Sequence, residues 1–351
     1  MKLIIQIPCY NEEQTLGLTL AELPRAIPGV DQVEWLIIND GSSDRTVEVA
    51  QQWGVDHIVS FEYNRGLAAG FMAGIEACLK AGADIIVNTD ADNQYCAADI
   101  PKLVTPILNG EAEMVIGERP IRSIPHFSPV KKFLQGFGSW VVRLASNTQI
   151  PDAPSGFRAI SRHAAIQLNV FNEYTYTLET IIQAGQRGMA ITSVPVRTNG
   201  DLRPSRLVKS IPTYIQRSVL TIFRIFMVYR PLRFFTLVGG VPFGMGMALC
   251  LRWLVLYWFD DPTRVRAPSL IVAAILILAG IQLWILGLVA DVLSVNRKML
   301  EDIQLRLRRA DVERYRNRSL EWNASNSTNP STSDEASANP AGDTTPVGDR
   351  H

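Results

Sequence analysis

Short apolar runs alternate with longer segments of helical pattern through the first part of the chain. The runs cover residues 3–7, 33–38, 57–60, 85–88 and 114–116. They are rich in β-branched residues and lack a regular polar alternation, which is typical of buried parallel strands. The segments between them, residues 15–26, 44–53, 66–80 and 98–108, are long enough for helices. This order predicts βαβ units and an α/β fold with a mainly parallel central sheet.

Two much longer apolar stretches follow in the second part of the chain. Residues 234–259 contain one charge, Arg252, and residues 269–290 contain none. Each exceeds the roughly 20 residues that cross a bilayer, so we expect a transmembrane hairpin rather than a buried hairpin of a soluble protein. Trp253, Tyr257 and Trp258 are suited to the membrane interface.

Basic residues flank the outer ends of both stretches, at Arg230, Arg233, Arg297 and Lys298. The positive-inside rule then places both chain ends in the cytoplasm, in an integral protein of the cell (inner) membrane.

The segments beside the hairpin are amphipathic. Residues 211–229 are mostly apolar with Arg217 and Arg224 seven apart, which favours a helix in the membrane interface. Residues 298–322 are charged, with Leu300, Ile303 and Leu307 at helical spacing, and either lie on the membrane or pair with a neighbouring subunit. Beyond residue 323 the composition is typical of a disordered tail.

Overall charge and cysteine content narrow the function. The chain has 34 Lys+Arg and 34 Asp+Glu in 351 residues, a balance that argues against nucleic acid as the main partner. Local basic clusters beside apolar segments instead indicate a membrane face or bound phosphates. The four cysteines contain no CxxC pair and are expected to be reduced thiols of a cytosolic domain. The four histidines form no cluster and receive no catalytic role.

Two carboxylates directly follow the fourth predicted strand. Asp90 and Asp92 lie where open α/β sheets bind ligands, at the carboxyl end of a strand. Side chains two apart in an extended chain point the same way, so the pair can share one hard cation whose other side binds a diphosphate. A polar turn after the strand is the alternative interpretation.

Polar motifs follow several of the predicted strands. They are Pro-Cys-Tyr-Asn-Glu-Glu at 8–13, Asn-Asp-Gly-Ser-Ser-Asp-Arg-Thr at 39–46, Asp-Ala-Asp-Asn-Gln at 90–94 and Asp-Ala-Pro-Ser-Gly-Phe-Arg at 152–158. By these motifs the chain resembles family 2 glycosyltransferases of the GT-A fold, in the branch similar to dolichyl-phosphate mannosyltransferase and other polyprenyl-phosphate glycosyltransferases. The resemblance covers roughly residues 1–210.

The resemblance implies a nucleotide-sugar site. In it, Pro8, Tyr10 and Glu12 line the base and ribose pocket and Asp40 contacts the base. Asp90 lies near the ribose and diphosphate, and the Mg²⁺ or Mn²⁺ ligands are Asp90, Asp92 and Gln94, in keeping with the preference of these ions for carboxylates and phosphate oxygens. Asp44 is alternatively a helix N-cap.

The resemblance also implies residues for the acceptor. Arg119, in Gly-Glu-Arg, faces the acceptor phosphate, joined by Ser155 and by Lys131 and Lys132, which are alternatively an ordinary solvated pair. Asp152 matches the residue assigned as catalytic base in the family. Because a lipid phosphate is already ionised near neutral pH, Asp152 alternatively orients the acceptor or sugar. Arg158 is expected to anchor its loop.

A basic cluster precedes the interfacial segment. Arg203, Arg206 and Lys209 resemble the segment that holds the diphosphate in relatives, and alternatively hold membrane phosphates.

The predicted protein is therefore a metal-dependent inverting hexosyltransferase that moves a sugar from a UDP- or GDP-sugar to polyprenyl phosphate. Its expected parts are a catalytic domain (1–209), an interfacial helix (210–232), a transmembrane hairpin (233–294), a charged helix (295–322) and a tail (323–351). A homo-oligomer, such as a tetramer, is expected from relatives with this hairpin. The alternatives are a transferase acting on a polysaccharide or glycolipid, and a non-catalytic nucleotide-sugar-binding scaffold.

Overall fold

A computed structural model describes residues 1–120, 148–170, 176–199, 230–259 and 267–327, with single residues at 143, 224 and 227. Its strands are β1 (Lys2–Cys9), β2 (Gln32–Asn39), β3 (His57–Ser60), β4 (Ile85–Asn88), β5 (Met114–Glu118), β6 (Arg158–Ser161) and β7 (Ile191–Pro195). Its helices are α1 (Leu16–Glu22), α2 (Thr46–Gln52), α3 (Leu67–Lys80), the 3₁₀ turn η1 (Ala97–Asp99), α4 (Ile100–Leu108), α6 (Arg162–Gln167), α7 (Thr177–Gln186), α9 (Pro231–Phe259) and α10 (Ala267–Ser327).

The strands described form one mixed sheet in the order β3-β2-β1-β4-β6-β5-β7. All five predicted runs are strands, and the mainly parallel α/β sheet is confirmed. The sequence did not predict β6 and β7. Of these, β6 runs antiparallel to both of its neighbours, β4 and β5.

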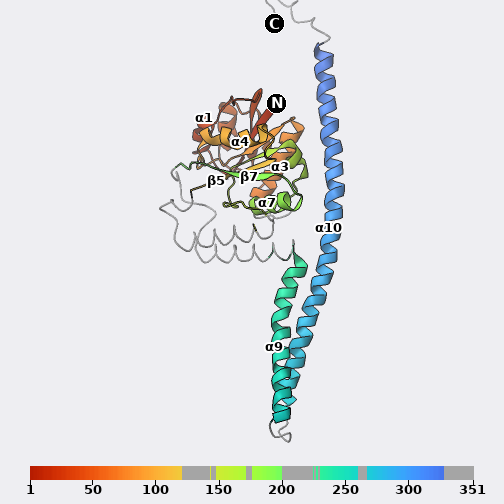
Figure 1. The fold of residues 1–351 in the computed structure, drawn as a ribbon. Helices are drawn as coiled ribbons and strands as arrows, with labels where there is room; N and C mark the ends of the chain where they lie inside the picture. The colour runs from red at the N-terminus through yellow and green to blue at the C-terminus, as the bar shows by residue number, and fades with distance from the viewer. Residues whose placement is uncertain are drawn as a thin grey trace, which may run out of the picture.

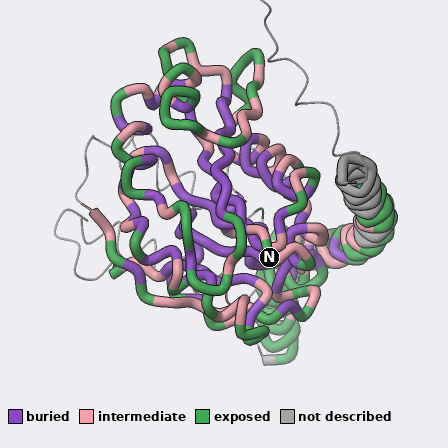
Figure 2. Tube along the Cα trace, turned by 90° about the horizontal axis from the view of Figure 1, so that it is seen from above, coloured by how far each residue is buried: buried purple, intermediate pink, exposed green. Residues whose placement is uncertain are grey.

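Helices cover both faces of the sheet (Figure 1). Alternate residues of each strand point to opposite sides, so Leu3 and Ile5 of β1 pack in the core beneath α1 and α4, while Ile4 packs in the core beneath α3. The buried positions fill the interior of the domain (Figure 2). Two filled cores explain why the strands are apolar on both faces.

The order of the strands reverses between β1 and β4. From β1 the chain builds outward to β2 and β3, and from β4 the sheet continues on the other side. In open α/β sheets ligands bind at such a switch point, outside the carboxyl ends of the strands. The loops that follow β1 and β4 therefore form the expected binding edge.

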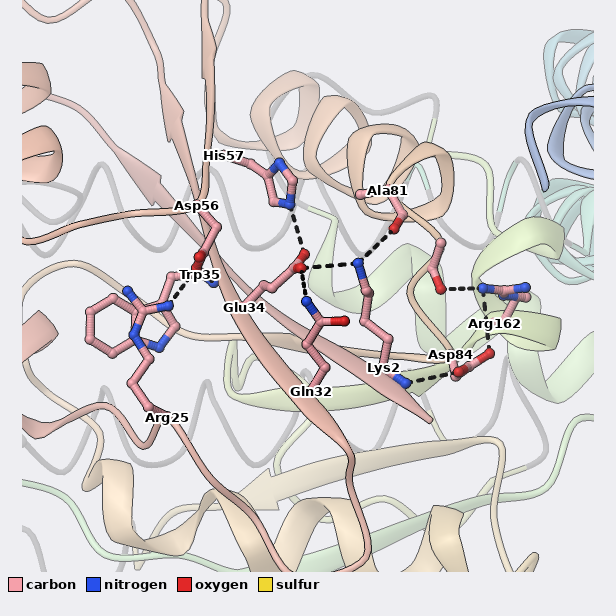
Figure 3. A network of polar contacts seen from close by, with 11 residues as sticks. Lys2, Arg25, Gln32, Glu34, Trp35, Asp56, His57, Ala81, Asp84 and Arg162 are labelled. Carbon is pink, nitrogen blue, oxygen red and sulfur yellow. Dashed lines mark hydrogen bonds and ion pairs between the residues drawn. The ribbon is translucent and has the colours of Figure 1, made fainter. Parts of the chain in front are cut away.

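The opposite, amino edge of the sheet is closed by polar contacts (Figure 3). Glu34 of β2 accepts hydrogen bonds from Lys2 Nζ at 3.0 Å and contacts His57 Nε2 at 2.8 Å. Burial alone would raise the pKa of Glu34, but the hydrogen bonds from His57 and Lys2 outweigh it and lower the pKa below its usual range. Next to them, Asp84 accepts the Lys2 backbone N–H at 2.8 Å and pairs with Arg162 at 3.4 Å.

The two long helices form an antiparallel hairpin below the domain (Figure 1). Within them, Pro231–Trp258 and Pro268–Arg297 are long and apolar enough to cross a membrane, by length and composition. Glycines let the helices approach closely: a Cβ on Gly239 would lie 3.0 Å from the carbonyl oxygen of Gly280, and one on Gly280 would lie 2.7 Å from Phe243 Cβ.

The second candidate span and the predicted charged segment belong to one helix. One helix, α10, runs without interruption from Ala267 to Ser327, and so includes the first residues of the predicted tail. No glycine or proline lies between Ile281 and Arg297 except Gly287, so the sequence holds little that would end the helix at the membrane boundary. The predicted interfacial helix lies almost entirely outside the described residues.

Candidate active site

Asp90 and Asp92 follow β4 at the switch point of the sheet. None of the residues that the structure describes donates a hydrogen bond to Asp90, and Asp92 Oδ1 accepts the Gln94 N–H at 3.2 Å. Burial raises the pKa of the Asp90 carboxyl above its usual range, and the negative charge of Asp92 raises it further, against the opposing effects of Arg119 and Arg158. No cation among the described residues therefore forms a hydrogen bond or ion pair with Asp90, although Arg119 and Arg158 lie close enough to lower its pKa.

Gly156 brings a second loop against Asp90. A Cβ at this position would lie 3.3 Å from Asp90 Oδ1 and 3.0 Å from the hydroxyl of Tyr176, closer than an ordinary van der Waals contact. Glycine therefore lets the loop approach Asp90 without displacing these neighbours. The peptide on each side of Gly156 is fixed by buried side chains: its N–H donates to Tyr95 Oη at 3.1 Å, and its carbonyl accepts from Asn88 Nδ2 at 2.9 Å. The loop that carries Asp152 is therefore held rigidly beside the carboxylate pair.

Asp152 and Arg119 form a bidentate ion pair. Arg119 Nε lies 2.7 Å from Asp152 Oδ2, and Nη2 lies 2.9 Å from Oδ1. Asp152 is 1% exposed, and the Arg119 side chain is 13% exposed. The structure thus pairs Asp152, predicted as the catalytic base, with Arg119, predicted as an acceptor-phosphate contact. Arg119 donates a hydrogen bond to each carboxylate oxygen of Asp152.

Glu118, beside Arg119, turns the other way. Its Oε2 lies 3.4 Å from the Ser193 hydroxyl of β7. The negative charge of the Gly-Glu-Arg element is therefore directed along the sheet rather than at the Asp152 pair.

Arg158 fixes the loop that contains Ser155 against helix α7. It is fully buried, and its guanidinium donates to Thr180 Oγ1 at 2.6 Å, to the Thr177 carbonyl and to the Ser155 carbonyl. Within the described part of the chain, its Nε and the buried Ser155 hydroxyl have no hydrogen-bond partner. The buried Ser155 lies in the loop between Asp152 and Gly156, where the acceptor contact was predicted.

The loops after β1 and β2 carry the predicted nucleotide residues. Pro8 is half-buried, Tyr10 is 43% exposed and Glu12 is buried, with its Oε2 accepting from Thr15 Oγ1 at 2.7 Å. Asp40 accepts the backbone N–H groups of Arg65 at 2.7 Å and Gly66 at 3.0 Å. Asp40 therefore shapes the start of α3 in this structure, while Tyr10 is the accessible member of the set.

Asp44 joins these two loops. Its Oδ1 accepts the Thr46 N–H at 3.1 Å at the start of α2, and its Oδ2 accepts the Glu13 N–H at 3.1 Å. The N-cap of α2 is Arg45, one residue later than the alternative interpretation expected, but Asp44 still accepts a hydrogen bond from the start of the helix.

An ion pair between the buried Asp99 and the exposed Arg197 fixes the chain that leads towards the basic cluster. Asp99 accepts from Arg197 Nη2 at 2.8 Å and from the Arg197 N–H at 2.7 Å, with Lys102 Nζ 2.9 Å away. Burial alone would raise the pKa of Asp99, but these hydrogen bonds outweigh it and hold the pKa below its usual range. Asn199 Nδ2 then donates to the Asn93 carbonyl at 3.0 Å, beside the carboxylate pair.

Several predicted site residues lie outside the described part of the chain: Lys131, Lys132, Arg203, Arg206 and Lys209. Gln94 is described and half-buried, and its carbonyl accepts the Asn199 N–H at 2.9 Å.

The carboxylate pair is suited to a hard divalent cation that also binds substrate. Among the described residues no group of three or more His, Cys, Asp or Glu side chains could hold a metal alone. Asp90 and Asp92 supply only oxygen, and a cation beside them would relieve the repulsion that raises the pKa of Asp90. Mg²⁺ is usually bound in this way, by one or two carboxylates and substrate phosphates, so the residues present fit such an ion.

The sequence did not single out Asn88, Tyr95 and Tyr176, which hold the Gly156 loop. Asn88 links them, because its Nδ2 donates to the Tyr176 hydroxyl at 2.9 Å as well as to Gly156. The available signal was the polar pair Gln6 and Asn88 inside two otherwise apolar strands, and Gln6 Nε2 indeed donates to Asn88 Oδ1 at 2.9 Å.

Comparison with known proteins places this fold and site in a class. The model of glycosyl transferase family 2 matches residues 4–168. An uncharacterized glycosyltransferase of Mycobacterium tuberculosis is 30% identical over 208 residues, covering 57% of this chain and 88% of that protein. The chain belongs to glycosyltransferase family 2.

Two further proteins share the domain. The UDP-N-acetylglucosamine–dolichyl-phosphate N-acetylglucosaminyltransferase of Methanococcus voltae is 29% identical over 217 residues, covering 55% of this chain and 83% of that protein. Glucosyl-3-phosphoglycerate synthase of M. tuberculosis, crystallised with Mn²⁺, UDP-glucose and phosphoglyceric acid, superposes with a TM-score of 0.51 at 21% identity, covering 63% of this chain and 79% of that one. The expected GT-A type of α/β domain, followed by two membrane-length helices, is confirmed.

Proposed function

We propose that this protein transfers a hexose from a UDP- or GDP-sugar to a polyprenyl phosphate at the membrane surface. The observation that carries the proposal is the pair Asp90 and Asp92, held at the switch point of a glycosyltransferase sheet with no cation among the described residues hydrogen-bonded to Asp90. The name of the M. voltae relative supports a lipid-phosphate acceptor, and the two membrane-length helices support a substrate that resides in the bilayer.

The donor is proposed to lie across the ends of β1 and β4. Pro8 and Tyr10 would contact the base and ribose, and Glu12 and Asp40 would shape the pocket through the contacts described above. Asp90, Asp92 and Gln94 would hold Mg²⁺ or Mn²⁺, which when bound neutralises charge on the diphosphate. Arg203, Arg206 and Lys209 are proposed to contact the same diphosphate from the opposite side.

The acceptor phosphate is proposed to bind beside Arg119 and the buried hydroxyl of Ser155, with Lys131 and Lys132 nearby. A phosphate oxygen would attack the anomeric carbon. The bond from that carbon to the nucleoside diphosphate breaks, its electron pair leaves with the diphosphate, and the configuration inverts.

Asp152 is proposed to position Arg119 rather than to remove a proton. A lipid phosphate is ionised near neutral pH and needs no base. Both oxygens of Asp152 accept hydrogen bonds from Arg119, which fixes the guanidinium in a defined orientation. A fixed guanidinium that meets charge in the transition state is the larger source of catalysis.

The orientation in the membrane follows from the flanking charges. Arg230, Arg233, Arg297 and Lys298 at the outer ends of the hairpin support a catalytic domain and chain ends on the cytoplasmic face of the cell (inner) membrane. The phosphate head could then reach the site while the isoprenoid tail stays in lipid.

The test is incubation of the purified full-length protein with radiolabelled UDP- and GDP-sugars, Mg²⁺ and undecaprenyl or dolichyl phosphate. The proposal expects label in a chloroform-soluble lipid that forms only when the polyprenyl phosphate is present. A water-soluble labelled polymer would instead favour a polysaccharide transferase. Bound nucleotide sugar without any labelled product would favour a scaffold.

A further inference from the structure

The second membrane-length helix, α10, continues past the candidate span and reaches the catalytic domain. The span ends at Arg297, whereas the helix runs on to Ser327. Arg308 lies eleven residues beyond the end of the span, about 16 Å along the helix axis. In Figure 1 this part of α10 rises beside the domain. One unbroken helix therefore connects the membrane hairpin to the catalytic domain.

One face of this helix binds the end of α6. Arg308 Nη1 donates to the carbonyl oxygens of Leu168 at 2.5 Å and Ile166 at 3.4 Å. Gln304, one turn earlier, accepts a hydrogen bond from the Asn169 side chain. The last carbonyl groups of a helix have no partner within that helix, so a guanidinium is well suited to bind them. Arg308 of the membrane helix thus caps α6 of the catalytic domain.

The end of α6 is in turn bound to α7. The Asn169 N–H donates to Gln183 Oε1 at 2.9 Å, and Gln183 Nε2 donates to the Asn169 carbonyl. Nearer the membrane, Arg297 Nη2 lies 3.6 Å from Oε1 of the buried Glu179, which is also on α7. The membrane helix therefore reaches α7 at two points, directly through Arg297 and indirectly through Asn169.

The first half of α7 holds residues 152–158, which we call the acceptor loop. Thr180 Oγ1 accepts a hydrogen bond at 2.6 Å from the buried Arg158, the last residue of that loop. The Tyr176 hydroxyl, at the N-cap of α7, accepts from Asn88 Nδ2 at 2.9 Å, and the same nitrogen donates to a carbonyl of the acceptor loop at 2.9 Å. A displacement of α7 would therefore displace the acceptor loop.

The donor side of the site is supported by other elements. Asp40 accepts from the backbone at the start of α3, and Asp92 accepts the Gln94 N–H. Among the described residues, no hydrogen bond joins Asp40 or Asp92 to α6, α7 or α10. A movement of α7 would thus act on the acceptor side, where Asp152 pairs with Arg119, more than on nucleotide binding.

We infer that Arg308 and Arg297 are positioning residues for sugar transfer: they dock α10 on α6 and α7, and so hold the acceptor loop where the lipid phosphate must bind. This deepens the proposed function and rests on it. Because α10 is also the second membrane-length helix, the same docking fixes the height of the acceptor loop above the bilayer. Position matters in such a reaction, since a misplacement of about 1 Å can cost roughly 100-fold in rate.

Transfer kinetics of the full-length protein test the inference, in nanodiscs of phosphatidylethanolamine and phosphatidylglycerol. Arg308→Ala should lower kcat/KM for polyprenyl phosphate ~10-fold, because the acceptor loop loses its support. The Kd of UDP or GDP, measured with Mn²⁺, should change less than ~2-fold, which a general loss of structure would not allow.

Arg309→Ala is the matched control, because Arg309 is exposed on the same turn of α10 and the substitution removes the same charge. It should keep the wild-type kcat/KM. Equal kinetics of Arg308→Ala and Arg309→Ala would overturn the inference. A loss of nucleotide binding by Arg308→Ala as large as its loss of transfer would overturn it as well, because the whole domain would then be disturbed.

Hydrogen exchange provides a readout that needs no sugar transfer. In Arg308→Ala, peptides that cover residues 152–161 and 176–186 should exchange at least ~3-fold faster than in the wild type, because a locally held element that loses contacts opens more often. Peptides that cover residues 32–46, on the donor side, should exchange at the wild-type rate. Unchanged exchange at residues 152–161 would overturn the inference whatever the activity.

The inference and the proposed function fail in different ways. If the wild type makes no labelled lipid while hydrogen exchange responds to Arg308→Ala as expected, transfer to polyprenyl phosphate is refuted and the link from α10 to the acceptor loop stands. If Arg308→Ala makes labelled lipid at the wild-type rate, the link is refuted and the transferase stands.

Discussion

The carboxylates at the two edges of the sheet differ in their partners and in the direction of their pKa shifts. At the amino edge Glu34 and Asp84 each have a cationic partner, and the contacts with Lys2 and His57 lower the pKa of Glu34 (Figure 3). At the carboxyl edge no described residue donates a hydrogen bond to Asp90, and burial and Asp92 raise its pKa. The first edge stabilises the fold. The second edge holds Asp90 and Asp92 close together, which lowers the stability of the folded domain but provides a site for a cationic ligand.

The largest expected effect comes from removing one charge at the carboxyl edge. Asp92→Asn should lower sugar transfer at least ~100-fold, because charge on the leaving diphosphate would lose its main compensation. The rate of labelled-lipid formation measures it. Asp84→Asn, at the amino edge, is the control for a lost carboxylate. A similar loss in both variants would mean that the two edges do not differ in function.

The next effect concerns the space beside Asp90. Gly156→Ala would place a methyl group 3.0 Å from the Tyr176 hydroxyl and 3.3 Å from Asp90 Oδ1, so the loop, Tyr176 or Asp90 must shift by a few tenths of an ångström. We expect transfer to fall ~10-fold or more and the free energy of unfolding to fall by about 1–3 kcal/mol, as for other overpacked sites. Kinetics and chemical denaturation measure the two changes.

Gly70→Ala is the matched control for that variant. A Cβ on Gly70 would lie 3.6 Å from Ile38 Cγ2, an ordinary contact, inside helix α3. Its activity should stay near that of the wild type. Wild-type transfer by Gly156→Ala would show that the close approach to Asp90 is dispensable.

Removing one carboxylate should change the melting temperature in opposite directions at the two edges of the sheet, and this effect is smaller than those on activity. At neutral pH and without cation or nucleotide, Asp90→Asn should raise the melting temperature by ~2–4 °C, as a gain of about 1 kcal/mol does in a domain of this size. The reason is that the variant removes a buried charge and its repulsion from Asp92. Glu34→Gln should lower it, because it weakens the contacts to Lys2 and His57. Shifts of the same sign would contradict the comparison.

The smallest expected effect is the pH dependence of the melting-temperature changes caused by Asp90→Asn and Glu34→Gln. The pKa of Asp90 is higher in the folded state than in the unfolded state, where it is near 3.9. Between these two pKa values the native protein binds more protons than the unfolded chain, so the free energy of unfolding falls as pH rises. The gain from Asp90→Asn should therefore disappear below about pH 4. Glu34, with a lowered pKa, contributes stability above its unfolded pKa, near 4.3, that is lost as the solution is acidified below it. Thermal unfolding across pH 3–8 compares the two.

Local patterns were sufficient to predict most of the fold. Mostly apolar runs identified five strands, and the carboxylates after β4 marked the binding edge, because both signals lie within a few residues. The strand β6 was missed because it begins with Arg158 and ends with Ser161, so it offers no apolar run. The burial of Arg158 depends on Thr180 and Thr177 of α7, which lie far along the chain.

The supporting contacts of the site could not be predicted in the same way. Asn88 meets Gly156 across 68 residues, and Arg119 meets Asp152 across 33, so no local spacing relates them. The motifs named Asp152 and Arg119 separately, and only the structure joins them as an ion pair. Likewise the contacts of α10 with α9 and with the catalytic domain join residues far apart in the chain, which composition alone does not reveal.

The most direct test of the central claim is a titration of Mn²⁺ followed by electron paramagnetic resonance, with and without UDP or GDP. The carboxylate pair with a substrate diphosphate predicts one Mn²⁺ bound per wild-type chain, tightly only when the fitting nucleotide is present, and no such binding by Asp92→Asn. Equal, nucleotide-independent Mn²⁺ binding by the wild type and Asp92→Asn would contradict the account.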